Sequence, residues 1–234
     1  SKPKSFYLII MLKSKHFELY YWSQEKYAKT YEALKNSIGQ VDLIIANDIP
    51  ALPIALKLKE KTAAKIYVDA HEYEPLHFNS FKFNFLYKQY WYNICKKFLP
   101  EADYMTTVCD GIAEKYSREF NVRCDVIMNL PFSSNLEPKN MDREKIKIIH
   151  HGAASQKRYI ENMIKLEQYL DDRYELHFML LNMNTQYGRS LMKYASKSYR
   201  VFFHKPVAME KIAENINSYD IGLYLLKPDS FNHK

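Results

Sequence analysis

Glycine is scarce in this sequence, at 5 of 234 residues. Turns that wrap a phosphate group usually depend on glycine, so a phosphate-binding turn has few positions here on which to form. Long apolar runs are missing too, because no stretch approaches the roughly 20 residues that a membrane-spanning helix requires. The opening residues Ser1–Lys4 are not followed by the apolar core of a signal peptide. We therefore expect the protein in the cytoplasm, including the inner face of the membrane.

Cysteine is also rare. The three residues Cys95, Cys109 and Cys124 are odd in number, and no pair has the spacing of metal ligands. This pattern favours reduced thiols in a cytosolic protein. The sequence holds no Asp-x-Asp signature, and the neighbouring His150 and His151 have no acidic partner close by in the sequence. We expect neither a metal ion nor a cofactor.

Basic residues outnumber acidic ones, 34 against 27, which gives a formal net charge of +7. A positive chain favours an anionic partner, such as a nucleotide, a phospholipid surface or a nucleic acid. The lysines are spread along the sequence, and no nucleic-acid-binding motif accompanies them. A nucleic-acid partner is therefore not expected.

Polar side chains follow two short apolar segments that read as buried strands, Val41–Ala46 and Ile66–Val68. Pro50 opens a helix between them, and strand, helix and strand form a parallel unit. Parallel strands end at one edge of their sheet, where ligands of open α/β folds bind. The residues expected at this edge are Asn47, Asp48, His71 and Glu72. The alternative is a solvated loop whose histidine and glutamate only cap the next helix.

The chain changes character between residues 133 and 145, where Ser, Asn, Pro and charged residues replace apolar ones. We predict an interdomain linker there. Strand and helix patterns alternate on both sides of it. This alternation predicts an α/β protein with two Rossmann-like lobes of parallel strands, one over residues 1–132 and the other over 146–234.

One segment, residues 78–98, is strongly aromatic. It fits a long helix that faces a core. It also fits an amphipathic surface for membrane or lipid, because lysines interleave the rings at positions 82, 88, 96 and 97.

Several short motifs in order resemble the retaining family 4 glycosyltransferases of the GT-B fold. In the first half they are Asn47-Asp48 before a Pro-opened helix, Asp69-Ala-His-Glu72 and Ile127-Met-Asn129. In the second half they are Ile149-His-His-Gly152, Arg158-Tyr-Ile-Glu161 and Asp220-Ile-Gly222. The sequence departs from the family at Tyr159, where glycine is usual. The family's first strand with its Gly-rich turn and its C-terminal Pro-Asn-Lys loop are absent, so we expect truncation at both ends and two incomplete GT-B-like lobes.

The resemblance implies a retaining, hexosyltransferase-like enzyme of surface polysaccharide or glycoconjugate synthesis. The donor would be a UDP- or GDP-linked sugar, and the acceptor a lipid-linked molecule or a saccharide, with peripheral membrane contact. The donor-binding residues would be Gly152, Lys157 and Arg158. The catalytic residues would be His71 and Glu72, and the acceptor or cleft residues Asn47, Asp48 and Asn129.

Two alternatives remain open from the sequence. A nucleotide-sugar epimerase can be built on the same two-lobed plan, because fold alone does not decide the reaction. A non-catalytic fragment that binds a partner or a membrane through its aromatic, basic segment is the other.

Overall fold

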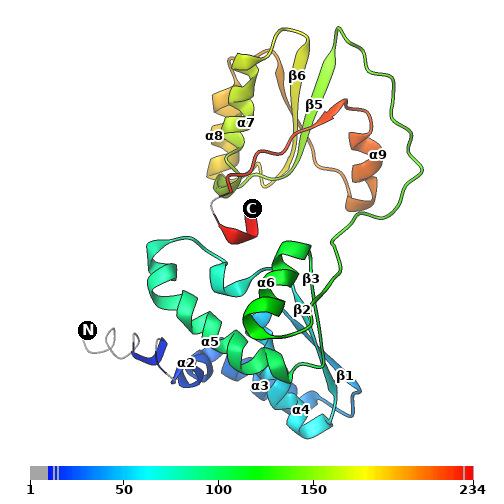
Figure 1. Ribbon diagram of the computed structural model, residues 1–234. Coiled ribbons are helices and arrows are strands. Elements are labelled where there is room, and N and C mark those ends of the chain that lie inside the picture. The colour runs from blue at the N-terminus through cyan, green and yellow to red at the C-terminus, as the bar shows by residue number, and fades with distance from the viewer. Residues whose placement is uncertain (1–9, 13, 15, 229, 234) are drawn as a thin grey trace. The chain divides into compact units, whose positions relative to one another are not determined.

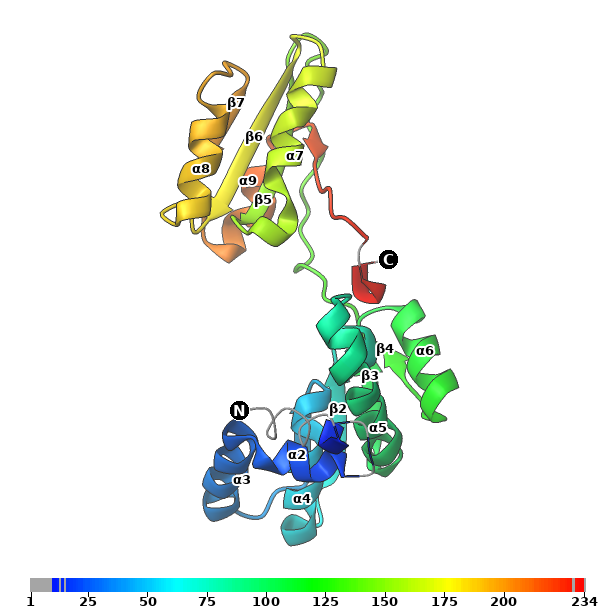
Figure 2. The ribbon, with the colours of Figure 1, turned by 90° about the vertical axis from the view of Figure 1, so that its left-hand side faces the viewer.

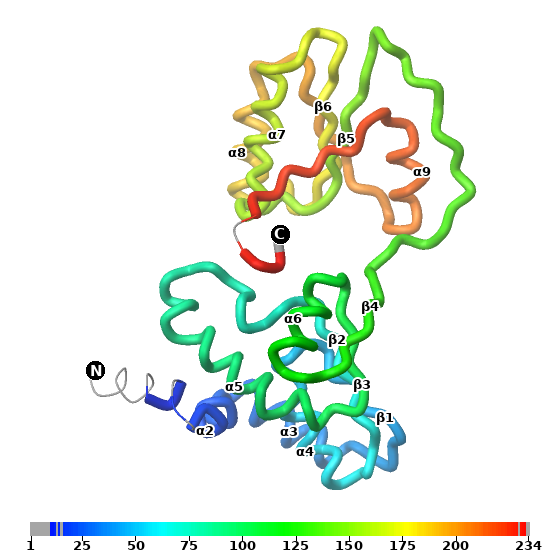
Figure 3. The backbone as a smooth tube through the Cα atoms, viewed as in Figure 1, coloured from blue at the N-terminus to red at the C-terminus, as the bar shows by residue number. Residues whose placement is uncertain are grey.

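The structure is a computed structural model that describes residues 10–12, 14, 16–228 and 230–233. The chain forms two compact units, one of the residues up to Leu130 together with those from Pro228, and the other of Pro131–Lys227 (Figures 1 and 3). The last residues thus differ from the predicted second lobe. They belong to the first unit because Phe231 packs 5.5 Å from the Tyr73 ring and Asn232 Oδ1 accepts a hydrogen bond from Tyr73 N.

The first unit is built on a sheet of four parallel strands in the order β1-β2-β3-β4. Their bounds are Leu43–Asn47, Lys65–Ala70, Tyr104–Thr107 and Asp125–Val126. Alternate residues of the central strand β2 are buried, with Ile66, Val68 and Ala70 facing the core. This period of two follows from the pleat of a strand.

Helices cover one face of this sheet (Figures 1 and 2). The α-helices of the unit are α2 (Phe17–Ser23), α3 (Glu25–Ser37), α4 (Leu52–Thr62), α5 (Lys88–Phe98) and α6 (Asp110–Phe120). Short 3₁₀ turns lie at η1 (Ile49–Ala51), η2 (Glu74–Leu76), η4 (Leu99–Glu101) and η8 (Phe231–His233), and a π-helical turn η3 (Phe83–Tyr87) leads into α5. Helix α4 packs on β1 and β2, and α6 packs on β3 and β4.

The opposite face of the same sheet is uncovered by the described part of the chain. Its apolar side chains are substantially exposed: Leu43, Ile45, Tyr104 and Ile127. Leu43, Tyr104 and Ile127, together with Tyr67 and Arg123, line a shallow hollow of about 590 Å³ on the sheet. Parallel sheets normally bury both faces, so this bare face is unusual for its strand type.

Two predictions about helices and strands differ in outcome. The all-apolar segment 6–12 favours a buried strand, with a helix start as the alternative; residues 10–12 are helical, and residues 6–9 lie outside the described part. A run of apolar residues does not distinguish a strand from a buried helix. The aromatic segment is confirmed as a helix that runs without a break from Phe81 to Phe98.

The second unit holds another four-stranded parallel sheet, in the order β7-β6-β5-β8. The strands are β5 (Ile146–Ala153), β6 (Tyr174–Leu181), β7 (Val201–His204) and β8 (Ile221–Gly222). Its helices are α7 (Ile160–Lys165), α8 (Gln186–Ala195) and α9 (Ile212–Ile216), with 3₁₀ turns η5 (Gln156–Arg158), η6 (Leu166–Tyr169) and η7 (Met209–Lys211).

Helices α7 and α8 lie on one face of this second sheet, and α9 lies on the other (Figures 1 and 2). The core under α7 and α8 contains Ile160, Met163, Leu176, Phe178 and Leu191. Thr185 caps the start of α8 by accepting a hydrogen bond from Gly188 N.

The α9 face of this sheet carries two paired histidines. His177, which is 7% exposed, has Nδ1 2.9 Å from Nε2 of His204 and Nε2 3.3 Å from a carboxylate oxygen of Glu175. Tyr219 lies against both imidazole rings. Burial, followed by the charge of His204, lowers the pKa of His177.

Two sheets of parallel strands, each flanked by helices, confirm the predicted α/β class with two GT-B-like, Rossmann-like lobes. Residues 127–142, which include most of the predicted linker, contain neither helix nor strand. Within the described ranges, no helix is both long and apolar enough to cross a bilayer.

Candidate functional site

The ends of β1 and β2 meet at one edge of the first sheet, as predicted. Asp48 directly follows β1, and its Oδ1 accepts a hydrogen bond of 2.9 Å from the backbone N–H of His71, which directly follows β2. Asp48 has φ of 64° and ψ of 158°, a strained backbone conformation that residues with a Cβ rarely adopt. This bond holds the two strand ends together and fixes the backbone of His71.

The carboxylate of Asp69 lies beside the imidazole ring of His71. Asp69 Oδ2 lies 3.4 Å from Nε2 of His71, and its Oδ1 accepts a hydrogen bond from the hydroxyl of Thr106 on β3. The His71 side chain is 48% exposed, so its ring is accessible to a ligand. Asp69 and Asp48 thus position His71 from two directions.

Glu72 contacts His77, not His71. Its Oε2 lies 2.7 Å from Nδ1 of His77, so it does not orient His71. The hydrogen bond that His77 donates to the Glu74 carboxylate raises the pKa of His77, and the nearby charge of Glu72 adds to this shift. The backbone of this loop is tied down by Tyr116, whose buried hydroxyl donates to the carbonyl of Glu72 and accepts from Glu74 N.

The two predicted asparagines lie at the same edge and are exposed. Asn47 is the last residue of β1, and Asn129 follows β4 by three residues. The backbone N–H of Ile127 extends the pairing with β3 by donating to the carbonyl of Thr107. The four strand ends therefore bring Asn47, Asp48, His71 and Asn129 to one sheet edge.

Gly152 is the next-to-last residue of β5, at the carboxyl edge of the second sheet. Its φ of +149° is a conformation that side chains other than hydrogen rarely adopt. The chain then leaves the sheet through η5, which carries the predicted cationic residues Lys157 and Arg158. The scarce glycine is thus used where the backbone needs it.

Arg158 contacts Tyr224, a residue that follows a neighbouring strand. Its Nη1 donates to the hydroxyl of Tyr224 at 3.3 Å, and its guanidinium lies 5.8 Å from the centre of that ring. Tyr224 follows β8, which pairs with β5. The guanidinium is therefore held beside the Gly152 turn by a side chain 66 residues further along the chain.

His150 lies under the same turn. It is 2% exposed, its Nδ1 is 2.8 Å from the carbonyl oxygen of Leu223, and its ring stacks on Tyr224. Its Nε2 is buried and has no hydrogen-bond partner among the described residues. Burial lowers the pKa of His150, and the neighbouring charges of His151 and Arg158 lower it further, which favours the neutral imidazole. His151 is exposed, so the two adjacent histidines point to opposite faces, as expected for a strand.

The N-terminus of a helix usually offers unpaired N–H groups to an anion, but the start of α7 differs. Its first N–H, that of Ile160, already donates to the hydroxyl of Tyr187, and this hydroxyl donates to the carboxylate of Glu161. Burial, together with Glu161, raises the pKa of Tyr187 to about 12. Anion binding at this edge therefore depends on the side chains of η5.

Tyr159 joins η5 to α7 with φ of 49°. This left-handed conformation explains why glycine suits the position, because it costs a residue with a Cβ about 1–2 kcal/mol. Tyr159 adopts the same turn without the freedom of glycine.

A small apolar hollow adjoins Gly152. It measures about 70 Å³ and is lined by the ends of β5 and β6 and the start of α9, through His151, Gly152, Met179, Leu181, Pro206, Val207 and Ile212. It is too small for a nucleotide, since ligand pockets usually measure about 300–1,000 Å³.

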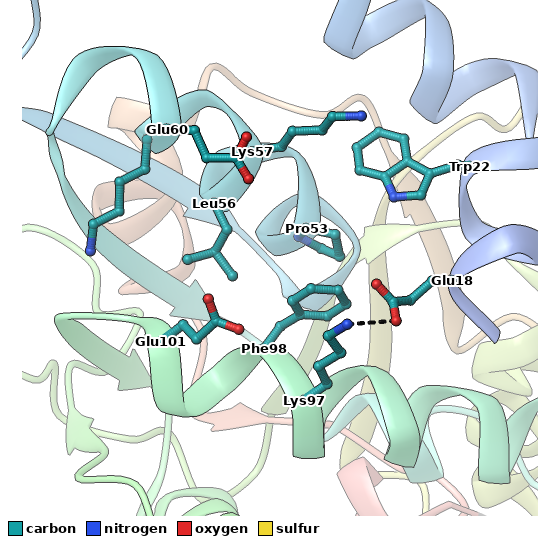
Figure 4. Close-up of a pocket in the computed structure, with 10 residues that line it drawn as sticks. Glu18, Trp22, Pro53, Leu56, Lys57, Glu60, Lys97, Phe98 and Glu101 are labelled. Atoms are coloured by element: carbon teal, nitrogen blue, oxygen red, sulfur yellow. Dashed lines mark hydrogen bonds and ion pairs between the residues drawn. The ribbon is translucent and has the colours of Figure 1, made fainter. Parts of the chain in front are cut away.

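A larger hollow, of about 460 Å³, lies away from the strand ends of the first unit, among α2, α4 and α5 (Figure 4). Lys57 points over the ring of Trp22 at 4.3 Å, and Lys97 forms a 2.6 Å ion pair with Glu18. Lys97 and Glu18 are the two charged lining residues that pair with each other, and none of the residues predicted for the site line this hollow.

Metal-ligating side chains do not gather in the described ranges, where no group of three or more His, Cys, Asp or Glu residues could hold an ion. Cys95, Cys109 and Cys124 are free thiols.

Three residues of these two sheet edges were not identified as site residues from the sequence. Asp69 could have been, because it lies in the same polar strand end as His71. Tyr187 and Tyr224 could not, because their contacts with Ile160 and Arg158 depend on how distant segments pack.

No protein-family model and no curated protein matches this chain. Among solved structures, it is similar to the sucrose-phosphate synthase of Thermosynechococcus elongatus, with a TM-score of 0.61, 15% identity, and coverage of 85% of this chain and 54% of that one. It is also similar to Anabaena Alr3699/HepE in complex with UDP, with a TM-score of 0.60, 16% identity, and coverage of 86% of this chain and 56% of that one. A further similar structure is the lipopolysaccharide outer core galactosyltransferase WaaB, with a TM-score of 0.55, 14% identity, and coverage of 86% of this chain and 54% of that one. The chain thus spans about half the length of these proteins, and the likeness establishes the fold.

Proposed function

We propose that this chain is part of a glycosyltransferase that takes a sugar from a UDP- or GDP-linked donor. Three kinds of support converge on this reading. The fold is that of the GT-B-like proteins it resembles, two of which are named in their structures as a galactosyltransferase and a sucrose-phosphate synthase. One neighbour, Alr3699/HepE, was solved in complex with UDP and also with UDP-glucose. The third kind is the arrangement around Gly152.

The observation that carries the proposal is that Gly152 lies at the carboxyl end of β5 and Arg158 on the turn η5 that follows it. Glycine at this turn lets a phosphate approach the backbone closely. The Arg158 guanidinium suits bidentate contact with phosphate oxygens, and the hydroxyl and ring of Tyr224 hold it in place. Lys157 adds a second positive charge on the same turn.

The chemistry follows from the leaving group. When the sugar departs, negative charge develops on the nucleoside diphosphate, and fixed cations at that position stabilise the transition state more than the ground state. The neutral His150 donates through Nδ1 to the Leu223 carbonyl, so its Nε2 can only accept, and it is a candidate hydrogen-bond partner for a ribose or sugar hydroxyl.

We assign the acceptor side to the first unit. His71 is the candidate catalytic residue, since Asp48 fixes its backbone and Asp69 lies beside its ring. Its imidazole would hydrogen-bond the acceptor or the transferring sugar. Glu72 would bind an acceptor hydroxyl through its remaining oxygen, and Asn47 and Asn129 would line the same edge.

The finer features remain part of the proposal. They are retention of configuration, a lipid-linked or saccharide acceptor, a role in polysaccharide or glycoconjugate synthesis, action at the cytoplasmic side of the membrane, and independence from a metal ion. The resemblance of the sequence motifs to retaining family 4 enzymes supports each of them.

The test measures donor binding by calorimetry or thermal shift with UDP, GDP and UDP-glucose. We expect Arg158→Ala to weaken binding of the preferred diphosphate about 10- to 100-fold, the effect of losing a charged hydrogen bond. Arg143→Ala is the matched control, because Arg143 is an exposed arginine of the same unit that is distant in sequence from η5. Equal affinities in the two variants would remove Arg158 from the donor site.

Reaction products then separate the enzyme classes. A transferase transfers the labelled sugar to an acceptor or to water and releases the diphosphate. An epimerase returns a changed nucleotide sugar without any acceptor, and that product would contradict the proposal.

A further inference from the structure

One segment of the first unit combines aromatic side chains with positive charge and contains no acidic residue. We call residues 78–88 the aromatic cap. Within this segment, and onward to residue 98, the sequence contains no aspartate or glutamate, although charged residues form 26% of the whole chain. The cap itself carries two lysines, Lys82 and Lys88. Such a composition is not expected for a helix that serves only to fill a core.

The helix that contains the cap has two faces with different surroundings. Tyr90, Trp91 and Ile94 of α5 are buried in the core of the unit, and so is Phe83 within η3. This accounts for the core-facing half of the sequence pattern. Other rings of the same segment are not used in this way.

Three phenylalanines of the cap are exposed instead. Phe81 is 85% exposed, Phe78 is 47% exposed and Phe85 is 46% exposed. The rings of Phe81 and Phe85 stack at 6.0 Å with planes 5° apart, so they form one apolar surface. The helical turn that carries them lies at the outer margin of the first unit (Figure 1). None of the hollows described above is lined by any of these three rings.

The two lysines flank this apolar surface, and both are exposed. A lysine can lay its apolar stem beside buried rings while its ammonium group stays in the polar layer. Aromatic rings with interleaved lysines are typical of segments that lie in the headgroup region of a bilayer. The lysines of a segment that contains no acidic residue of its own add attraction to anionic lipid.

We propose that the aromatic cap is a contact surface for an anionic lipid bilayer, into which Phe81 and Phe85 insert while Lys82 and Lys88 bind the lipid phosphates. A bilayer suits this surface better than a protein groove, because the stacked rings protrude from a helix turn and the attraction needed is to negative charge without a fixed shape. This contact does not depend on sugar transfer.

The cap also borders the candidate acceptor residues. The Phe78 ring lies 4.1 Å from the ring of His77, and His77 contacts Glu72. Docking through the cap would therefore bring the acceptor-side sheet edge next to the lipid headgroups. If the proposed function is right, this placement favours a lipid-linked acceptor, and that last step alone rests on the proposed function.

The test is sedimentation of the chain with sucrose-loaded vesicles of phosphatidylcholine, alone or mixed with phosphatidylglycerol. We expect binding to the anionic vesicles to exceed binding to the neutral ones and to weaken with salt, because screening reduces the lysine contribution. Each lysine near the surface should contribute about fivefold to the partition coefficient. Equal binding to both vesicle types, or no binding, would overturn the proposal.

Variants locate the contact on the molecule. Phe81→Ser with Phe85→Ser should lower partitioning about tenfold or more, since partial burial of two phenyl rings is lost. Phe132→Ser is the matched control, because this ring is 97% exposed in the other unit and should leave binding unchanged. Lys82→Glu with Lys88→Glu should abolish the preference for anionic lipid, whereas Lys139→Glu with Lys205→Glu changes net charge equally and should retain it.

Two further measurements keep the outcome decisive. Phe81→Trp should show a blue-shifted, lipid-quenched emission with brominated anionic vesicles, which a ring that stays in water would not show. Light scattering reports the oligomeric state. If the chain binds no vesicles and forms a dimer that dissociates in the Phe81→Ser, Phe85→Ser variant, the cap is a contact between copies. That result would refute the proposed contact with a bilayer.

Discussion

Replacing Gly152 by alanine should destabilise the second unit through the backbone alone. A Cβ built at Gly152 would meet only Nε2 of His150, at 3.9 Å, which is an ordinary contact distance. The penalty therefore comes from φ of +149°, which a residue with a Cβ adopts at a cost of about 1–3 kcal/mol. The alanine also stabilises by about 0.4–1 kcal/mol, because it restricts the unfolded chain.

The matched control is Gly222→Ala on the neighbouring strand β8. Gly222 has no left-handed φ, and a Cβ there would meet nothing within 4 Å. This variant keeps the gain from the unfolded state without the strain. The two variants should therefore differ in free energy of unfolding by about 1–3 kcal/mol, which corresponds to a shift of roughly 0.7–2 M in urea midpoint for a domain of this size.

The assay can report the two units separately. Both tryptophans of the chain, Trp22 and Trp91, lie in the first unit. Tryptophan fluorescence therefore follows unfolding of the first unit, while far-UV circular dichroism follows both. We expect Gly152→Ala to lower the midpoint of the dichroism component that fluorescence does not report.

Equal urea midpoints for Gly152→Ala and Gly222→Ala would refute the reasoning, because the only difference proposed between the two sites is backbone strain. A parallel shift of both probes would instead show that the units unfold together, and the difference between the variants would still measure the strain.

Two other outcomes are expected. The free energy of unfolding of the second unit should fall as the pH drops below about 6.5. Folding lowers the pKa of His177, so the unfolded state takes up the proton first. The stability that comes from the neutral ring is therefore complete above that pH and is lost on acidification. His177→Gln should flatten this part of the dichroism-detected pH profile, and a profile as steep as before would exclude His177 as its source. Tyr73→Phe should cost the first unit about 1–3 kcal/mol in tryptophan-detected denaturation, since Glu119 loses a buried hydroxyl donor. Tyr104→Phe, at an exposed tyrosine of the same unit, should cost nothing, and equal midpoints for the two would contradict this assignment.

The sequence predicted what short-range patterns determine. The period of two in Ile66–Ala70 and the proline at position 50 define a strand–helix–strand unit, and parallel pairing then places Asp48 and His71 at one edge. The same logic predicted that His150 and His151 point to opposite faces. These features follow from local geometry and need no knowledge of the distant chain.

Contacts between distant segments could not be read in this way. Nothing in the residues around Arg158 indicates that Tyr224 holds it, because that contact depends on β8 pairing with β5. Phe231 and Asn232 pack on Tyr73 of the first unit although they follow the second unit in the chain. The start of α7 failed as a prediction for a related reason, since Tyr187 reaches its first N–H from α8.

The bare face of the first sheet has a practical consequence. Alternate positions of β1 and β3, such as Leu43, Ile45 and Tyr104, expose a hydrophobic side chain to water. Such a surface lowers solubility and makes copies of the chain adhere to each other. Because these positions alternate with the core, polar residues can be introduced there without disturbing Ile66 or Val68, and a better-behaved sample can be engineered on that side alone.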